Sequence, residues 1–397
     1  MKKVLFIYPS MIIGGSTTAL LSLINNLNPD EYEIDLQLQK NEGPLFDVIP
    51  SHVNILPEAE IYSGKKGRFI KLFRFVFSGS FWVSLYRGIF VSKTRIISRD
   101  VAGDFKARKL SRINTKNYDY AISFLEGGSN TYLAYNVTAK KKYAWLHATF
   151  ESITKDPKYQ ISWMNKVDKL VFVTDACKKH FCQILPEMSD KTIVIQNITD
   201  SEIVKRRSLM IDQTDEQYKR FCSDERFKIV TVCRLDMDIK GLDRVALCAK
   251  ALKEKGAKFL WYIIGDGPDK ARLEEMIVSL GIESDLCMIG KRMNPFPFIA
   301  ASDIMCMPSR FEGKPMVITE SMILGTPPVV TEYLAAHEQI DNGIEGIIVS
   351  NEDESIQDAI LKCINDKKMI SNMSEYLKNK EYGNSCYITE IEKYLFE

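Results

Sequence analysis

The sequence lacks the residue patterns that mark metal-binding and disulfide-stabilised proteins. Only four histidines occur among 397 residues, and His52, His180 and His337 have no ligand spacing with His147. The nine cysteines are odd in number, scattered mostly within apolar segments, and form no CxxC pair. This usage favours a reducing cytoplasm with buried thiols, and it leaves a metal site or a cofactor without support.

Long hydrophobic runs and common phosphate-binding fingerprints are also missing. There is neither a GxGxxG dinucleotide motif nor a GxxxxGK[ST] phosphate loop. In the most aromatic stretch, only twelve uncharged residues separate Arg74 from Arg87, which is too short for a transmembrane helix. The opening "MKKVLFIYPSMIIGG" starts like a signal peptide, but Pro9 interrupts it and no small-residue cleavage site follows. We interpret it as a buried first strand.

Charge is nearly balanced over the whole chain but unevenly distributed along it. The net charge is +1, yet residues 64–112 hold thirteen Lys and Arg against two Asp, a net of +11. Aromatic and apolar residues are interleaved with these cations, a composition that fits an anionic membrane surface. A solvated basic face over core helices is the alternative, with nucleic acid a distant third. We expect membrane docking and no nucleic-acid partner.

Strand-like apolar runs alternate with helical patterns along almost the whole chain, which predicts parallel sheets joined by βαβ crossovers. The length suits two domains of about 200 residues each. A polar, charged stretch at residues 198–227 is interpreted as the linker. We therefore predict an α/β protein with two doubly wound Rossmann-like domains, 1–198 and 199–397, facing each other across a ligand cleft. The last helix is a candidate to return to the first domain.

The first half offers a glycine-rich turn where an open α/β sheet binds anions. Gly14 and Gly15 follow the first strand and precede an amphipathic helix, for which Ser16 is the expected cap. Exposed amides there could face a phosphate or a sugar hydroxyl. A Gly-Gly turn by itself is a weak signal.

The second half offers two cations in "VCRLDMDIKGLDR". Arg234 ends a strand and Lys240 precedes the next helix, an arrangement that suits a diphosphate, with Arg as a fork and Lys as a point charge. Asp236 and Asp238 spell a DxD and could hold a metal–nucleotide complex. We disfavour that alternative because the two cations already supply the positive charge.

Two glutamates flank a mostly apolar run in "SRFEGKPMVITESMILG". Pro315 suits the first turn of a helix and Gly325 its end, so Glu312 lies on the loop ahead and Glu320 within the helix. A phosphate at the helix amino end would meet free amides and the positive end of the dipole. Glu312 could then reach sugar hydroxyls and Glu320 a ribose.

Taken in order, these segments resemble the retaining nucleotide-sugar glycosyltransferases of family 4, which have the GT-B fold. The resemblance rests on Gly14-Gly15, Arg234, Lys240, "IIGDGP", "IAASDIMCMPSRFEGKPMVITESMILGTPPVV" and "EGIIV", and extends over nearly the whole chain. The histidine of "AWLH", His147, looks like the family's cleft histidine; without that context it would be interpreted as a satisfied core residue.

The resemblance implies a role for each matching position. Arg234 and Lys240 would clamp the diphosphate, Glu312 would contact the transferred sugar, and Glu320 would bind the ribose. The remaining substrate-binding positions would be Gly14, Gly15, Ile289, Gly290, Gly313, Lys314 and Pro315, with the backbone around Ile289 and Gly290 holding the base. Gly313-Lys314-Pro315 stands where many members have Gly-Phe-Gly or Gly-Phe-Pro, which places a cation beside the sugar site.

The expected activity is therefore that of a retaining, metal-independent hexosyltransferase. Its donor would be a nucleotide sugar, UDP-linked by preference and GDP-linked as the alternative, bound as substrate with no cofactor. The acceptor would be a glycan or a lipid-linked precursor in cell-surface polysaccharide synthesis, at the cytoplasmic face of the plasma membrane. A non-catalytic sugar-nucleotide-binding partner on the same fold and a sugar-nucleotide epimerase are the alternatives.

Overall fold

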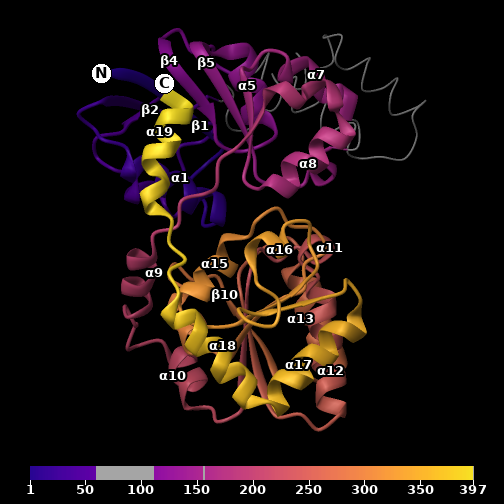
Figure 1. The fold of residues 1–397 in the computed structure, drawn as a ribbon. Coiled ribbons are helices and arrows are strands. Elements are labelled where there is room, and N and C mark those ends of the chain that lie inside the picture. Colours follow the sequence, from indigo (N-terminus) through magenta and orange to yellow (C-terminus); the bar gives the residue numbers. More distant parts are fainter. Residues whose placement is uncertain (60–110, 155–156, 397) are drawn as a thin grey trace. The chain divides into compact units, whose positions relative to one another are not determined.

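The computed structural model describes residues 1–59, 111–154 and 157–396 (Figure 1). These residues form two compact units, residues 1–197 with 386–397 and residues 198–385. Each unit is built on one parallel β-sheet, so the predicted α/β class with two Rossmann-like domains is confirmed. The basic segment 64–112 lies outside the described residues except for its last two, and membrane docking through it stays a prediction.

The first unit has a seven-stranded sheet in the order β3-β2-β1-β4-β5-β6-β7. Its elements are β1 (Lys2–Tyr8), α1 (Gly15–Asn26), β2 (Tyr32–Leu38), β3 (Asn54–Ile55), β4 (Asn117–Ser123), α5 (Gly128–Asn136), β5 (Thr138–Leu146), α6 (Phe150–Ile153), α7 (Pro157–Met164), β6 (Lys169–Phe172), α8 (Asp175–Ile184), β7 (Thr192–Val194) and α19 (Ile388–Phe396). The strand order reverses between β1 and β4, and such a switch point is where open α/β sheets bind ligands. The segment interpreted as a buried first strand forms β1.

The last helix, α19, packs on the first unit, although it follows the second in sequence. The backbone oxygen of Phe396 accepts hydrogen bonds from Lys2 Nζ and from the Tyr120 hydroxyl, both at 2.7 Å. The ring of Phe396 lies 4.8 Å from that of Tyr32 and 5.0 Å from that of Tyr120, centroid to centroid. Figure 1 shows α19 beside β1 and β2. The first unit is thus completed by the carboxyl end of the chain.

The second unit has a six-stranded sheet in the order β10-β9-β8-β11-β12-β13. Its strands are β8 (Phe227–Val232), β9 (Phe259–Ile264), β10 (Leu286–Gly290), β11 (Ile304–Met307), β12 (Pro328–Thr331) and β13 (Ile347–Val349). Its helices are α9 (Ser201–Ser208), α10 (Glu216–Ser223), α11 (Met237–Lys240), α12 (Leu242–Glu254), α13 (Lys270–Leu280), α14 (Phe296–Ala300), α15 (Met316–Ile323), α16 (Ala336–Gln339), α17 (Asp353–Asn365) and α18 (Lys367–Asn379).

Both faces of this second sheet are apolar, because helices cover both. β9 has every residue buried, as expected for a central parallel strand. On one face Trp261 and Ile263 join a core cluster with α12, α13, α17 and α18. On the other, the Tyr262 ring lies 4.5 Å from that of Phe221 on α10, which lies 5.9 Å from that of Phe298 on α14.

The interpretation of residues 198–227 as a linker is wrong, because they fold as two helices of the second unit. Asp200 caps α9 by accepting from the backbone N–H of Ile203 at 2.9 Å. Asp215 caps α10 by accepting from Gln217 N at 3.0 Å. The charged residues form the exposed faces of these helices, whereas Phe221 is fully buried. Two Asp caps, each followed by a Glu in the first turn, are the sequence signal that identifies such helices.

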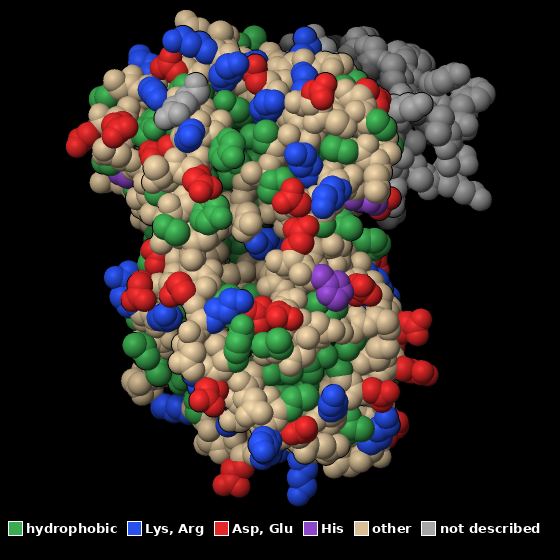
Figure 2. All heavy atoms as spheres, in the orientation of Figure 1, with side chains coloured by type: hydrophobic (Ala, Val, Ile, Leu, Met, Phe, Trp, Pro, Cys, Tyr) green, Lys and Arg blue, Asp and Glu red, His purple; other side chains and the backbone are tan. Residues whose placement is uncertain are grey.

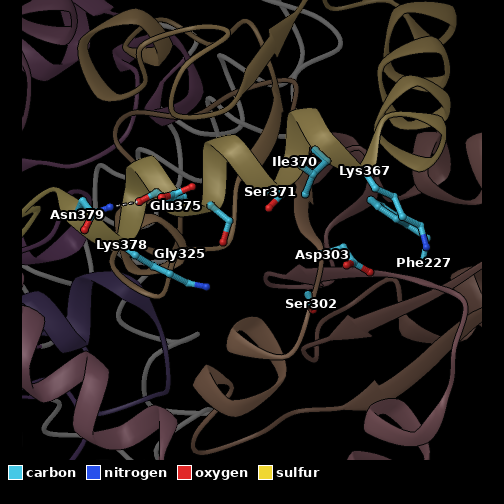
Figure 3. A pocket seen from close by; sticks show the side chains of 11 residues that line it. Phe227, Ser302, Asp303, Gly325, Lys367, Ile370, Ser371, Glu375, Lys378 and Asn379 are labelled. Atoms are coloured by element: carbon cyan, nitrogen blue, oxygen red, sulfur yellow. Dashed lines mark hydrogen bonds between the residues drawn. The ribbon is translucent and has the colours of Figure 1, made fainter.

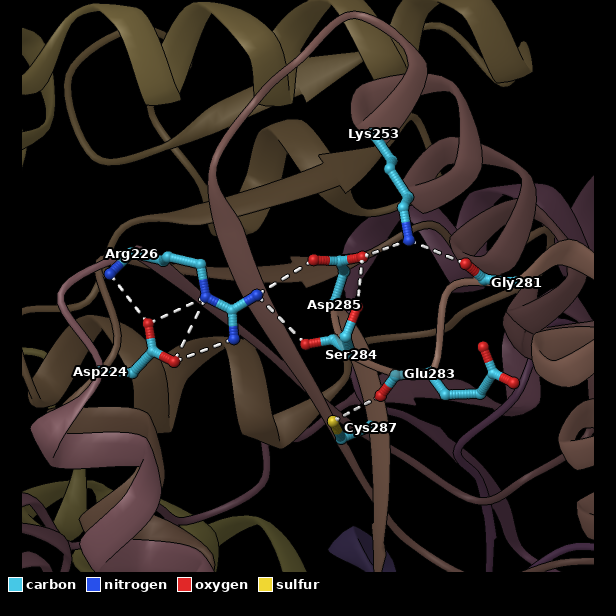
Figure 4. Close-up of polar contacts among 8 residues, drawn as sticks. All are labelled: Asp224, Arg226, Lys253, Gly281, Glu283, Ser284, Asp285 and Cys287. Carbon is cyan, nitrogen blue, oxygen red and sulfur yellow. Dashed lines mark hydrogen bonds and ion pairs between the residues drawn. The ribbon is translucent and has the colours of Figure 1, made fainter.

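A charged network joins the amino ends of β8 and β10 (Figure 4). Arg226 donates to both carboxylate oxygens of Asp224 and, at 3.0 Å, to Asp285. Lys253 on α12 also pairs with Asp285 at 3.0 Å. The pKa of Asp224 is held below its usual value, chiefly by the hydrogen bond from Arg226. Internal ion pairs therefore hold the amino ends of β8 and β10 together.

Candidate functional site

The strand order of the second unit reverses between β8 and β11, so the loops after these two strands lie at one topological switch point. The loop after β8 carries Arg234 and leads into α11, which ends at Lys240. The loop after β11 carries Glu312 and leads into α15. The fold thus brings the predicted cations and the first predicted glutamate to the same edge, although about seventy residues separate them in sequence.

Lys240 and Glu312 form an ion pair at this edge, between Lys240 Nζ and Glu312 Oε1. Their side chains are only 21% and 10% exposed. Burial acts to lower the pKa of Lys240, but the charge of Glu312 and the hydrogen bond to it, together with the influence of Cys233 and Asp236, outweigh burial and the pKa is raised. Lys240 is therefore held as a cation beside the carboxylate that the sequence assigns to the sugar.

Arg234 has an exposed side chain two residues after β8, with no protein partner among the described residues. Asp236, the first residue of the DxD, accepts from the backbone N–H of Ile239 at 3.2 Å and caps α11. This cap gives Asp236 a role in positioning Lys240. The guanidinium of Arg234 is available to an anion.

Close backbone contacts hold these loops together. An added Cβ on Gly241, which has φ +64°, would lie 2.2 Å from the carbonyl oxygen of Pro308. An added Cβ on Gly265, in the "IIGDGP" segment, would lie 1.9 Å from the carbonyl oxygen of Cys233. Only glycine permits either approach, so the loops after β8, β9 and β11 pack with their backbones in contact.

Arg310 adds a side-chain clamp that sequence reasoning missed. It donates to both carboxylate oxygens of Asp243 at 2.8 and 2.7 Å, and to the carbonyl oxygen of Met237 at 2.9 Å. The clamp fixes the loop that carries Glu312 against α11 and α12. No short motif joins residues 67 positions apart, so nothing local in the sequence signals it.

The helix α15 has the predicted form, with Glu320 inside it and Glu312 on the loop before it. Pro315 occupies the N-cap position, just before the first turn, and Gly325 follows the end with φ +73°. The backbone N–H groups of Met316 and Val317 donate to no acceptor in the described parts of the chain. These amides and the helix dipole favour an anion at this end.

The loop ahead of α15 is supported from α16. Gln339 Nε2 donates to the carbonyl oxygen of Pro315 at 3.0 Å and to Thr319 Oγ1 at 2.9 Å, while its Oε1 accepts from the Tyr333 hydroxyl at 2.6 Å. Gly313 is buried and Lys314 half-buried; burial lowers the pKa of Lys314. The three predicted residues Gly313, Lys314 and Pro315 therefore form one ordered turn beside Glu312.

Glu320 is 8% exposed and accepts no hydrogen bond from the described protein. Burial raises the pKa of its carboxyl to about 7, and the charge of Arg207 acts in the opposite direction. A buried carboxylate without donors is costly. Glu320 is thus an acceptor whose hydrogen-bonding capacity the protein leaves unused.

Ile289 and Gly290 end β10 at the same edge of the sheet. Ile289 is buried, and Gly290 has φ +73°. The carbonyl oxygen of Gly290 accepts from Gly265 N at 3.1 Å, and an added Cβ at Gly290 would meet no atom within 4 Å. The backbone at Gly290 is therefore uncrowded, as a backbone-recognition position requires.

In the first unit, Gly14 is the N-cap of α1 and Gly15 its first residue, after the loop that follows the switch-point strand β1. Gly14 has extended backbone, and an added Cβ there would meet nothing within 4 Å. The expectation that Ser16 caps α1 is wrong. The Tyr8 hydroxyl contacts Ser16 Oγ at 2.7 Å and Thr17 Oγ1 at 3.1 Å, so the serine is bonded to the strand and the cap position is Gly14.

His147 directly follows β5 and is half-buried. Its Nε2 lies 2.9 Å from the carbonyl oxygen of Phe124, which can only accept, so this nitrogen carries the proton. Nδ1 lies 3.4 Å from the amide nitrogen of Asn197. Burial lowers the pKa of His147 and outweighs the charge of Glu126, which acts to raise it. The ring is therefore neutral near pH 7. Glu126 also accepts from the backbone N–H of His147 at 3.0 Å.

A cavity of about 530 Å³ lies at the opposite edge of the second sheet (Figure 3). It lies between Lys367, Ser371 and Lys378 of α18 and the amino ends of β8 and β11, at Phe227 and Asp303. Ligands of open α/β sheets bind outside the carboxyl ends of the strands. This cavity is therefore separate from the Lys240–Glu312 edge.

On the face shown in Figure 2, acidic and basic side chains are interspersed over the described residues of both units. Among those residues, no helix combines the length and the apolar character needed to cross a bilayer.

The fold and the anion-favouring edge of the second unit define a protein of the GT-B class. Residues 212–380, less than half of the chain, match the model of the family described as "Glycosyl transferases group 1". The resemblance to glycosyltransferases that was found in the sequence is confirmed at the level of this family description.

Individual relatives agree with this assignment. An uncharacterized glycosyltransferase of Methanocaldococcus jannaschii is 27% identical over 173 residues, 44% of this chain and 42% of the relative. The N-acetyl-alpha-D-glucosaminyl L-malate synthase of Bacillus anthracis is 29% identical over 141 residues, 35% of this chain and 36% of the relative. The matches thus span about two fifths of each relative's length.

A solved structure covers the whole chain. Anabaena HepE in complex with UDP and glucose aligns with 100% of this chain and 99% of its own, with a TM-score of 0.72 and 16% identity. At that identity the likeness establishes the GT-B fold. It includes the first unit, which the family match does not reach.

Proposed function

We propose that this protein is a retaining glycosyltransferase that moves a sugar from a nucleotide sugar to a glycan or a lipid-linked acceptor. UDP-sugars are the favoured donors and GDP-sugars the alternative. The observation that carries the proposal is the Lys240–Glu312 pair at the switch point, next to the unbonded amides of α15. This edge combines a cation, backbone N–H groups that donate to no acceptor among the described residues, and a carboxylate that the proposal assigns to the transferred sugar.

The proposed chemistry is charge stabilisation of a leaving nucleoside diphosphate. When the bond between the sugar and the diphosphate breaks, negative charge grows on the phosphate oxygens. Lys240, Arg234 and the amino end of α15 are positioned to stabilise that charge, the usual largest contribution in such sites. These groups supply the positive charge for which other enzymes use a metal, so the proposed reaction is metal-independent.

Retention follows in this proposal from attack on the face that the departing diphosphate occupies. In that scheme no carboxylate acts as a nucleophile: Glu312 contacts the transferred sugar and Glu320 the ribose. Gly14, Gly15 and His147 of the first unit are assigned to the sugar and acceptor side, as the family resemblance implies.

The test is a screen of UDP- and GDP-sugars by thermal shift, followed by measurement of nucleotide release with each sugar that binds. A bound donor that is turned over supports the enzyme. A donor that binds without any turnover, across a panel of glycan and lipid-linked acceptors, indicates the non-catalytic partner instead. Chelation with EDTA is expected to leave turnover unchanged.

We further propose that residues 64–112 dock the protein on an anionic cytoplasmic membrane surface, where a lipid-linked acceptor would be reached. The support is the net charge of +11 with interleaved aromatic residues. Binding to anionic vesicles should fall with added salt. It should fall further when Lys65, Lys66, Arg68, Lys71 and Arg74 are changed to Gln. Vesicle binding that is absent, or indifferent to these changes, contradicts docking.

A further inference from the structure

Arg207, which the sequence did not single out, is anchored on the loop that follows Gly290. Its Nη2 donates to the carbonyl oxygen of Met293 at 2.7 Å, and its guanidinium carbon lies 4.8 Å from the centroid of the Phe296 ring. The backbone oxygen of Arg207 accepts from Asn294 Nδ2 at 2.7 Å. The residue is therefore fixed at both its backbone and its side chain to the segment between β10 and α14.

The helix that carries Arg207, α9, also packs against α15, which carries Glu320. No nitrogen–oxygen pair between Arg207 and Glu320 falls within 4.0 Å, yet each is the charged group that opposes the effect of burial on the other. Burial raises the pKa of Glu320 and lowers that of Arg207. The guanidinium thus acts on the carboxyl through space, without consuming its hydrogen-bonding capacity.

The other elements packed against α15 offer Glu320 little alternative charge. They include α14, β12 and α18, and also α16, whose Gln339 donates to Thr319 Oγ1 and whose ionisable residues, His337 and Glu338, are exposed. The segments of α14 and β12, FPFIA and PVVT, contain no ionisable residue. From α18, the stem of Lys378 lies over Gly325, past the opposite end of α15. Burial is the larger influence on the charge state of Glu320, and Arg207 is the cation that opposes it.

We propose that Arg207 is a positioning residue of the nucleotide site, which favours the ionised form of Glu320 that accepts ribose hydroxyls and joins α9, packed on α15, to the loop after Gly290. The inference rests on the proposed function, because it takes the ribose of a nucleoside diphosphate as the partner of Glu320. It adds a residue of α9 to a site otherwise built from the carboxyl ends of the strands.

This arrangement predicts a pH dependence that a purely structural role for Arg207 would not give. With the carboxyl of Glu320 near its midpoint at pH 7, about half of the free protein is ready to accept two hydroxyl donors. Removal of a nearby opposite charge raises the midpoint by about one pH unit. The ionised fraction at pH 7 then falls to about a tenth and the affinity about fivefold, whereas at pH 9 the loss nearly disappears.

The experiment is calorimetric titration with UDP and with GDP at pH 6, 7, 8 and 9. The variants are Arg207→Gln, Arg207→Lys as the charge-retaining rescue, and Arg206→Gln as an exposed control on the same helix. Arg207→Gln should weaken binding about fivefold at pH 7 and less than twofold at pH 9. Arg207→Lys should restore most of the pH profile, and Arg206→Gln should match the wild type.

A loss that is the same at every pH, or no loss at all, overturns the inference while the proposed function stands. A second measurement tests the inference without any nucleotide. NMR of protein with labelled glutamate follows the titration of the Glu320 carboxyl, and the Glu320→Gln variant assigns its signal. An unchanged midpoint in Arg207→Gln also overturns the inference. A wild-type protein that binds neither UDP nor GDP refutes the proposed function, and with it the ribose as the partner of Glu320. In that case a shift of the Glu320 titration midpoint in Arg207→Gln would show only that the charges of Arg207 and Glu320 interact.

Discussion

Lys240 at the end of α11 and Glu312 on the loop before α15 form an ion pair. In the proposed reaction the first belongs to the diphosphate and the second to the sugar. The pair therefore links the two loops that carry the proposed halves of the donor site. A diphosphate would compete with Glu312 for the same ammonium group and free the carboxylate for sugar hydroxyls.

Lys240→Ala and Arg234→Ala should each lower turnover by roughly tenfold to 150-fold, because each removes a charge-assisted contact worth about 1.5–3 kcal/mol. Steady-state kinetics measures this, with Lys258→Ala as an exposed control in the same unit. Only the Lys240 variant should also lose stability, because it leaves half-buried Glu312 unpaired. Wild-type turnover in a folded variant would remove that residue from the clamp.

Glu312→Gln should cripple transfer and retain affinity for the free nucleoside diphosphate, whereas Glu320→Ala should mainly weaken nucleotide binding. The reason is their placement, one ahead of α15 and one within it. Calorimetry with UDP and GDP, alongside turnover, separates the two effects. Equal losses of diphosphate affinity in the two variants would contradict the assignment.

Glu320→Gln should stabilise the protein at pH 8 and have little effect near pH 4. Burial raises the folded-state pKa of Glu320 to about 7, above the value of about 4.3 for an unfolded chain. The stability linked to its proton is therefore full below the unfolded pKa and is lost as pH rises through 7, by about 4 kcal/mol in total. The glutamine side chain of the variant does not titrate, so the variant does not lose this stability as the pH rises.

Urea unfolding of Glu320→Gln at the two pH values measures that difference. Glu275→Gln, at an exposed position of α13, is the control and should show no such pH dependence. A Glu320→Gln variant that is no more stable than the wild type at pH 8 would show that the carboxyl is not strained by burial.

Gly241→Ala should destabilise the second unit far more than Gly256→Ala. Both glycines have positive φ, +64° and +74°, so both variants carry similar backbone strain. Only at Gly241 would the new Cβ lie 2.2 Å from the carbonyl oxygen of Pro308, whereas Gly256 faces open space. Thermal unfolding gives the comparison, and equal losses would mean that the two loops are not packed as described.

Much of this site can be predicted from sequence because its signals are local. Neighbouring residues are enough to recognise a strand that is followed by Arg234 and Lys240. They are also enough to recognise a helix bounded by Pro315 and Gly325. Topology then brings them together, since carboxyl ends of neighbouring parallel strands share an edge. The fold class follows from the same alternation of strands and helices.

The residues that sequence reasoning missed act over long range. Arg310 meets Asp243, and Arg207 meets Met293 and Glu320, only through tertiary packing. The linker interpretation failed for a different reason, because charged faces concealed helices that bury Val204 and Phe221. The Ser16 cap failed because the Tyr8 hydroxyl binds that side chain instead.

The most direct test of the account is a crystal structure of the protein with UDP or GDP bound. We expect the diphosphate at the backbone N–H groups of Met316 and Val317 and within reach of Lys240 and Arg234, with the ribose hydroxyls on Glu320. A nucleotide bound elsewhere, for instance in the cavity beside Lys367 and Lys378, would contradict the assignment of this edge as the donor site.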